Sequence, residues 1–209
     1  MNTEALFAGT PIVPVVVIDD VNDSVPLVEA LLEAGIGAIE ITLRTEAGLG
    51  AIERVAKECP DIIVGAGSIR RVGQIKQVMD AGAQFCVSPG YSDGLLVEAK
   101  ARDAHLIPGA GTATEILQLY ERGYTLVKFF PAELSGGLPM IKALSAPLPE
   151  IRFFPTGGIT AELAVEYLAT TCVACVGGTW FVSPDRIRAG DFTWIAEQAS
   201  QALQSLHRS

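Results

Sequence analysis

The chain has 209 residues, of which 49% are hydrophobic and 19% are charged, and this composition suits one α/β domain covering residues 1–209. Its 15 basic and 24 acidic residues give a net charge of −9, and no Lys/Arg-rich stripe accompanies an aromatic run, which excludes a typical nucleic-acid-binding surface. The first four residues lack a basic segment and the apolar run Ile12–Ile18 is too short to span a bilayer, so we expect a cytoplasmic protein with no membrane partner.

Eight short runs rich in Val, Ile and Phe recur at even spacing, and each is predicted to be a β-strand. They are Ile12–Ile18, Ala38–Arg44, Asp61–Gly65, Gln84–Ser88, His105–Pro108, Thr125–Phe130, Ile151–Pro155 and Val173–Gly177. Segments with helical periodicity lie between them, including Val25–Ala34, Gln74–Ala81 and Ala113–Arg122. Glycines follow these three helices, at positions where a residue with positive φ is favoured: Gly35, Gly82 and Gly123.

This rhythm is typical of repeated βα units and therefore of parallel strands. An open, doubly wound sheet is the alternative, but no Gly-x-Gly-x-x-Gly follows the first strand and no change in composition divides the chain. We therefore predict a single-domain, closed (β/α)8 TIM barrel. In that fold, the active site lies at the C-terminal ends of the strands, and the loops after strands seven and eight commonly bind phosphate.

One lysine, Lys128, lies in the middle of an apolar run, where a bare ammonium is unfavourable to bury. Most buried lysines are structural ion pairs, so this position alone does not establish chemistry. Alternation along the strand places Lys128 on the same face as Leu126 and Phe130, toward the barrel interior. Because burial disfavours the charged form of an amine, we predict that Lys128 is a nucleophile that forms an imine with a carbonyl substrate.

The second predicted strand alternates strictly between apolar and polar residues, which puts Glu40, Thr42 and Arg44 on one face. We expect this face to point into the barrel, beside Lys128. The functional interpretation makes Arg44 a fork-shaped ligand for a substrate carboxylate and Glu40 a group that moves protons. The structural alternative is an ion pair between Glu40 and Arg44.

Two pairs of glycines follow the last two predicted strands, namely Gly157–Gly158 and Gly177–Gly178, and Thr179 comes next. A single Gly-Gly pair is usually only a tight turn. Two pairs at these positions predict a phosphate site, because glycine lets backbone N–H groups approach an anion closely.

Cys172 and Cys175 form a Cys-x-x-Cys, but no second pair accompanies them and the chain has only two histidines. Cys175 is expected inside the eighth strand. We therefore expect buried thiols rather than a metal or redox site, and neither a metal nor another cofactor for the reaction.

Six segments together closely resemble the 2-keto-3-deoxy-6-phosphogluconate (KDPG) aldolase family, in the same order from Pro11 to about Phe192. They are Glu40-Ile41-Thr42-Leu43-Arg44-Thr45, Gly65-Ala66-Gly67, Ser88-Pro89-Gly90, Lys128-Phe129-Phe130-Pro131-Ala132-Glu133, Pro155-Thr156-Gly157-Gly158-Ile159 and Gly177-Gly178-Thr179-Trp180. The resemblance implies a homotrimeric class I aldolase that cleaves KDPG to pyruvate and glyceraldehyde 3-phosphate in the Entner–Doudoroff pathway. It also implies some 4-hydroxy-2-oxoglutarate aldolase activity.

The resemblance gives roles to individual residues. Lys128 would form the imine, Glu40 would move protons, and Arg44 would bind the pyruvate carboxylate. The remaining roles are pyruvate binding by Ser68, Pro89 and Phe130, and phosphate binding by Gly157, Gly158, Gly178 and Thr179. Thr156 would contact a substrate hydroxyl and favour the gluconate substrate over its galactonate epimer, because the aldolase for the epimer tends to have an aliphatic residue there.

The chain also departs from the family pattern. Ser68 stands where the family usually has threonine, and Thr179 where it usually has serine. Gly111 and Ala146 lie in loops, at positions where the family usually has other residues. None of these changes removes a catalytic group. The alternatives are an aldolase for the galactonate epimer, a sugar-phosphate isomerase or epimerase, and a barrel that binds a sugar phosphate without catalysis; neither of the last two needs Lys128 as a nucleophile.

Overall fold

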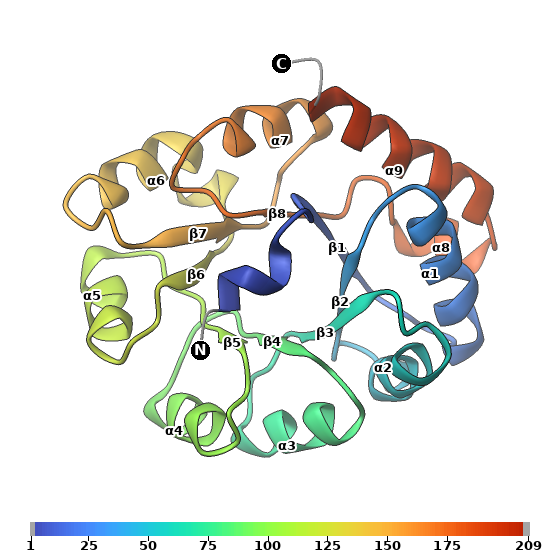
Figure 1. Cartoon of the computed structure of the whole chain (residues 1–209), viewed down its shortest axis with the longest axis horizontal. Helices are drawn as coiled ribbons and strands as arrows, with labels where there is room; N and C mark the ends of the chain where they lie inside the picture. The colour runs from blue at the N-terminus through green and yellow to red at the C-terminus, as the bar shows by residue number, and fades with distance from the viewer. Residues whose placement is uncertain (1–2, 207–209) are drawn as a thin grey trace.

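The computed structural model describes residues 3–206, and strands and helices alternate along it (Figure 1). The two ends of the predicted domain, residues 1–2 and 207–209, lie outside the described residues. The strands are β1 (Ile12–Val16), β2 (Ala38–Thr42), β3 (Ile63–Gly67), β4 (Phe85–Val87), β5 (Leu106–Ile107), β6 (Leu126–Phe129), β7 (Arg152–Pro155) and β8 (Val176–Gly178).

Helices connect the strands and surround them in the view of Figure 1. They are α1 (Ser24–Glu33), α2 (Ala47–Glu58), α3 (Val72–Asp80), α4 (Asp93–Ala101), α5 (Ala113–Glu121), α6 (Gly137–Ser145), α7 (Ala161–Leu168), α8 (Pro184–Arg188) and α9 (Phe192–Leu206), with short 3-10 helices η1 (Thr3–Phe7), η2 (Val21–Asp23) and η3 (Glu133–Ser135). Gly35, Gly82 and Gly123 have positive φ, as predicted. Within residues 3–206, no helix has the length and apolar character needed to cross a membrane.

Each predicted strand corresponds to an observed one, but several boundaries were wrong. Strand β2 stops at Thr42 and β6 at Phe129, so Arg44 and Phe130 lie just beyond strand ends. Strand β8 begins only at Val176 because the chain before it turns, with the Val173 N–H donating to Thr170 O at 2.9 Å. Cys175 is therefore outside the strand in which it was expected.

All strand pairs are parallel, which confirms the predicted α/β class with parallel strands. Six strands form one sheet in the order β5-β4-β3-β2-β1-β8, and β6 pairs with β7 in a second sheet. Single parallel bridges link this pair to its neighbours: Gly109 to Lys128 on one side, and Phe153 to Val173 and Thr156 to Gly177 on the other.

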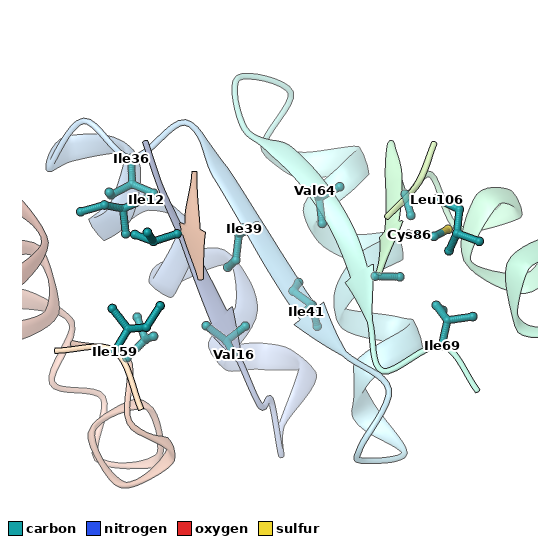
Figure 2. Close-up of a cluster of buried hydrophobic side chains, with 14 of the residues drawn as sticks. Ile12, Val16, Ile36, Ile39, Ile41, Val64, Ile69, Cys86, Leu106 and Ile159 are labelled. Atoms are coloured by element: carbon teal, nitrogen blue, oxygen red, sulfur yellow. The ribbon is translucent and has the colours of Figure 1, made fainter. Parts of the chain in front are cut away.

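The strands divide their side chains between two apolar clusters, as their alternation predicts. The outer cluster lies between strands and helices, and Figure 2 shows Ile12, Val16, Ile39, Ile41 and Val64 within it. The inner cluster comprises Phe7, Val13, Ala38, Phe85, Val87, Ile107, Leu126, Phe154 and Cys175. Residues that alternate in phase with this inner set therefore face the interior surrounded by the strands.

The N-terminal helix η1 closes one end of this interior. Phe7 is buried, and its ring centroid lies 5.1 Å from that of Phe85 and 6.0 Å from that of Phe154. The rings of Phe7 and Phe85 meet edge to face, which is a favourable aromatic geometry. Helix η1 therefore supplies Phe7 as an aromatic plug at one end of the inner cluster.

Replacement of Phe7 by alanine is expected to lower the free energy of unfolding by about 3 kcal/mol, because it leaves a cavity in the inner cluster. Urea unfolding followed by circular dichroism measures this change. Val97→Ala is the matched control, since Val97 on α4 is 68% exposed and its truncation should change stability by less than about 0.5 kcal/mol. Equal stabilities of the two variants would contradict the role of Phe7 as a plug.

Candidate active site

The central feature of the interior is a buried pair of opposite charges. Lys128 on β6 is 5% exposed and Glu40 on β2 is fully buried, and Lys128 Nζ lies 3.2 Å from Glu40 Oε1 and 3.4 Å from Oε2. Both residues are in phase with inner-cluster neighbours, Leu126 and Ala38, so strand alternation places them. The pair brings an amine and a proton acceptor together at a site that is shielded from solvent.

Glycines on β3 make room for this arrangement. A Cβ added at Gly67 would lie 2.1 Å from Glu40 Oε1 and 2.7 Å from its Cγ, closer than any real contact. A Cβ at Gly65 would similarly meet the Phe85 ring at 2.2 Å. The carboxylate of Glu40 therefore reaches Lys128 only because Gly67 has no side chain.

Aromatic rings lie close to the amine. Lys128 Nζ is 5.5 Å from the centroid of Phe130 and 5.9 Å from that of Phe154. Phe130 was predicted at the site, whereas Phe154 was missed, although its alternation with Phe153 on β7 could have indicated an inward ring. These rings reduce the polarity around the amine and stabilise its cationic form when it is protonated.

Arg44 lies in the turn after β2 and is exposed, and its Nε donates to Ser68 Oγ at 3.2 Å. The structure thus brings the two predicted carboxylate ligands together, and the alternative ion pair between Glu40 and Arg44 does not form because Glu40 pairs with Lys128. Ser68 follows β3 with φ of +60°, a backbone conformation that is strained for residues with a side chain. Serine tolerates this strain better than the β-branched threonine would.

The predicted phosphate segments also lie at the C-terminal strand ends. Gly157 and Gly158 both have positive φ, and a Cβ at Gly157 would lie 3.3 Å from the Phe130 ring. Gly178 ends β8, and Thr179 follows it in an exposed position. The turn after β7 is thus packed directly against the Phe130 ring, which lies 5.5 Å from Lys128 Nζ.

Two further predicted residues complete this end of the molecule. Thr156 is buried, and its Oγ1 has no hydrogen-bond partner among residues 3–206. A Cβ at Gly177 would lie 2.3 Å from that oxygen. This glycine, on the neighbouring strand β8, therefore leaves room for the Thr156 hydroxyl. Pro89 is exposed after β4 and packs on Gly109, where a Cβ would lie 2.3 Å from Pro89 O.

The cysteines lie outside this group. Burial raises the pKa of the Cys86 thiol to about 12 and also raises the pKa of Cys175, so both remain protonated at neutral pH. All four cysteines are free thiols, and Cys172 is only partly buried. Among residues 3–206, no three His, Cys, Asp or Glu side chains gather in a group that would hold a metal ion.

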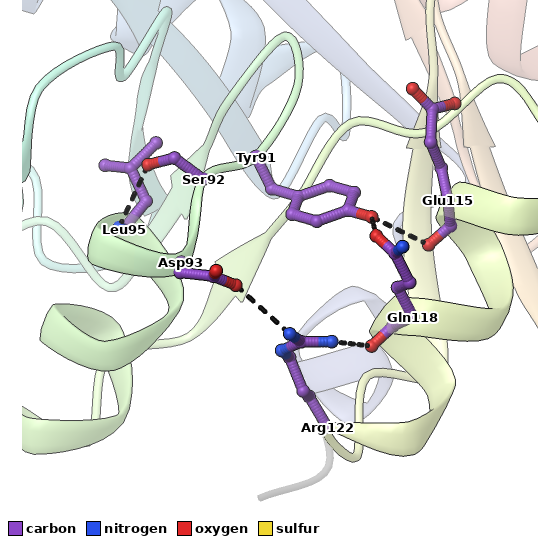
Figure 3. A network of polar contacts seen from close by, with 7 residues as sticks. All are labelled: Tyr91, Ser92, Asp93, Leu95, Glu115, Gln118 and Arg122. Carbon is purple, nitrogen blue, oxygen red and sulfur yellow. Dashed lines mark hydrogen bonds and ion pairs between the residues drawn. The ribbon is translucent and has the colours of Figure 1, made fainter.

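A cleft of about 770 Å³ lies elsewhere, between α4 and the end of α5 with the segment that follows it. Figure 3 shows how polar contacts bridge these helices: Arg122 pairs with Asp93 at 3.1 Å, and the Tyr91 hydroxyl contacts Gln118. None of the predicted site residues lines this cleft. It is a gap between two helices that are held by side-chain bridges.

A family model, sequence relatives and solved structures all match this chain to the same family of enzymes. The family model for KDPG and KHG aldolase matches residues 3–198. A 2-dehydro-3-deoxy-phosphogluconate aldolase of Pseudoalteromonas atlantica is 44% identical over 97% of this chain and 94% of its own length, and the KHG/KDPG aldolase of Escherichia coli is 40% identical over 97% and 95%. The crystal structure of a KDPG aldolase from Legionella pneumophila, with pyruvate captured as a covalent carbinolamine intermediate, superposes with a TM-score of 0.93 at 40% identity, covering 97% of this chain and 98% of that one.

Gly67→Ala is expected to lower the free energy of unfolding by about 3 kcal/mol, because the new methyl group displaces Glu40 and leaves the buried Lys128 without its partner. Gly73→Ala is the matched control: Gly73 lies on α3 with nothing within 4 Å of an added Cβ, and alanine there should stabilise the helix by up to about 1 kcal/mol. Chemical denaturation of both variants measures the difference. A Gly67→Ala variant as stable as the control would show that Glu40 is not fixed against β3.

Proposed function

The chain belongs to the KDPG and KHG aldolase family, and we propose that it cleaves 2-dehydro-3-deoxy-6-phosphogluconate to pyruvate and glyceraldehyde 3-phosphate through an imine on Lys128. The chain is thus an aldolase, a carbon–carbon lyase. The observation that carries the residue assignment is the buried contact of 3.2 Å between Lys128 Nζ and Glu40 Oε1. The covalent carbinolamine of the similar Legionella enzyme supports it, since a carbinolamine is the adduct that precedes an imine.

The first steps use both members of the pair. Glu40 takes a proton from the Lys128 ammonium, and the free amine adds to the C2 carbonyl of the substrate to give a carbinolamine. The protonated Glu40 gives this proton to the carbinolamine hydroxyl, which leaves as water, so a protonated imine forms and the Glu40 carboxylate is restored. The protonated imine withdraws electrons from the C3–C4 bond. Because Glu40 is the buried carboxylate beside the nitrogen, it is the group placed to exchange these protons.

Cleavage and release follow from the same geometry. As Glu40 accepts the C4 hydroxyl proton, the C3–C4 bond breaks, its electrons move into the imine, and glyceraldehyde 3-phosphate leaves. The enamine that remains takes a proton at C3, and hydrolysis of the resulting imine releases pyruvate and regenerates Lys128. A shorter 4-hydroxy-2-oxo acid undergoes the same steps, so we also propose activity on 4-hydroxy-2-oxoglutarate.

We assign binding of the pyruvate part of the substrate to the residues around the Lys128 amine. Arg44 donates two parallel hydrogen bonds to the substrate carboxylate, with Ser68 as a further donor. The contact between Arg44 and Ser68 supports this, because it holds the guanidinium over the end of β3. Pro89 and Phe130 form the walls of the pocket, and the Phe130 ring lies 5.5 Å from the amine.

The distal phosphate is assigned to the strand ends of β7 and β8. Successive backbone N–H groups in turns with positive φ form concave anion sites, and Gly157 and Gly158 have this conformation. Gly178 and the hydroxyl of Thr179 complete the proposed site, as the loops after strands seven and eight do in many barrels.

We further propose that the eight strands form one closed (β/α)8 barrel in a single domain covering residues 1–209. The single bridges on both sides of the β6–β7 pair support closure, and one continuous apolar cluster from Ile12 to Ala202 supports a single domain. A homotrimer in the cytoplasm, acting in the Entner–Doudoroff pathway, is also proposed. Exposed apolar side chains, among them Val97, Leu117 and Leu134, are compatible with association of the subunits.

The substrate epimer is assigned through Thr156. A buried hydroxyl without a partner is unfavourable in the free protein, and a substrate hydroxyl at C4 would satisfy it. We therefore favour the gluconate epimer over the galactonate one.

Coupled assays of pyruvate release test both assignments. The wild-type protein is expected to cleave the gluconate substrate faster than the galactonate epimer, and Lys128→Ala to give a blank with both. Thr156→Val keeps the shape but removes the hydroxyl, so the preference should fall about tenfold. Thr171→Val, at an exposed threonine before β8, is the matched control. Equal wild-type rates on the two epimers would refute the role of Thr156, and activity in Lys128→Ala would refute the imine.

A further inference from the structure

We propose that Glu133 and Tyr167 are a pair of positioning residues that hold the Gly157–Gly158 turn in place for the substrate phosphate. Glu133 begins η3, five residues after Lys128, and Tyr167 is on α7. The inference rests on the proposed function, since it concerns the phosphate end of the same site. It adds two residues that do not contact the reacting atoms.

The backbone first ties the segment after Lys128 to the turn. Thr156 N–H donates to Phe129 O at 3.0 Å, Ala132 N–H to Thr156 O at 2.9 Å, and Glu133 N–H to Gly157 O at 3.1 Å. These bonds continue the pairing of β6 with β7 beyond the strand ends. The position of Glu133 is therefore coupled to that of Gly157.

The side chain of Glu133 then packs on the second glycine of the turn. A Cβ added at Gly158 would lie 2.9 Å from both Cβ and Cγ of Glu133, and Gly158 has φ of +79°. A Cβ at Gly137 would lie 3.3 Å from Glu133 Oε1 and 3.4 Å from the Tyr167 hydroxyl oxygen. The glycines on both sides therefore leave space for the Glu133 side chain.

Tyr167 holds the Glu133 carboxylate through a hydrogen bond. Its side chain is fully buried, and its hydroxyl donates to Glu133 Oε1 at 2.5 Å. Burial, followed by the hydrogen bond to Glu133, raises the pKa of Tyr167, so the hydroxyl stays protonated as a donor. Hydrogen bonds from a neutral donor to a carboxylate are among the stronger ones in proteins.

The charge of Glu133 explains why its orientation matters for the substrate. A carboxylate next to a turn that holds a phosphate would repel that phosphate if it swung toward it. Tyr167, on α7, holds one oxygen of this carboxylate through its hydroxyl group. Loss of the hydroxyl should therefore weaken binding of phosphorylated ligands and leave the chemistry at Lys128 unchanged.

The experiment compares a phosphorylated substrate with a reaction that needs no phosphate. The first measurement is the KM and kcat for cleavage of the six-carbon phosphorylated substrate, together with inhibition by inorganic phosphate. The second is exchange of the pyruvate methyl protons with deuterated water, followed by nuclear magnetic resonance, which requires Lys128, Glu40 and the pyruvate-binding residues but no phosphate site. The variants are Tyr167→Phe, Glu133→Ala and Glu133→Gln, with thermal unfolding as the check on folding.

We expect Tyr167→Phe and Glu133→Ala to raise the KM for the phosphorylated substrate about five- to tenfold, to weaken phosphate inhibition, and to leave the pyruvate exchange rate within twofold of wild type. Glu133→Gln keeps an acceptor oxygen for Tyr167 and should restore a KM near the wild-type value. Tyr91→Phe is the matched control, because its hydroxyl also joins two segments, in the bridge to α5 of Figure 3, far along the chain from the turn.

Equal losses in cleavage and in pyruvate exchange would overturn the proposal and make the pair a general structural contact. An unchanged KM in both Tyr167→Phe and Glu133→Ala would overturn it as well. Should Tyr167→Phe fail to fold, Glu133→Ala carries the same test. Failure of the proposed function is a separate result, since the wild-type protein would then show neither cleavage nor pyruvate exchange.

Discussion

The contact between the Lys128 ammonium and the Glu40 carboxylate is the interaction on which the rest of the site depends. Both groups are buried, and neither would be stable there without the other. Because Glu40 Oε1 lies 3.2 Å from Lys128 Nζ, a proton can pass directly between the two groups. The nucleophile and the proton acceptor are thus held together as one buried ion pair.

The alternation of side chains along each β-strand places this ion pair in the interior. Alternate residues face the inner cluster and the outer cluster, so a single strand contributes both to the core and to the site. The plug formed by Phe7 closes the interior at the end opposite to the site, and glycines such as Gly67 leave the space that Glu40 occupies. Small residues and aromatic residues are therefore as necessary to the amine as its charged partner.

Much of this arrangement could be predicted from the sequence, because strand periodicity alone indicates which side chains face inward. Glu40 and Lys128 were placed on the same interior for that reason, 88 residues apart along the chain. Features that depend on turns could not be predicted in this way. Periodicity does not encode the positive φ of Ser68, the position of Arg44 beyond the end of β2, or the late start of β8, where a local hydrogen bond from Val173 N–H to Thr170 O turns the chain. Contacts between distant segments, such as Tyr167 with Glu133 and Gly67 with Glu40, require the register of the folded strands.

The most direct test of the account is reduction with borohydride in the presence of pyruvate, followed by peptide mapping of the protein. If the Lys128 amine attacks the carbonyl, the reduced imine forms a stable adduct on the peptide that contains Lys128, and no adduct forms without pyruvate or in Lys128→Ala. An adduct on a different lysine, or none at all in an intact and folded protein, would contradict the assignment of Lys128 as the nucleophile.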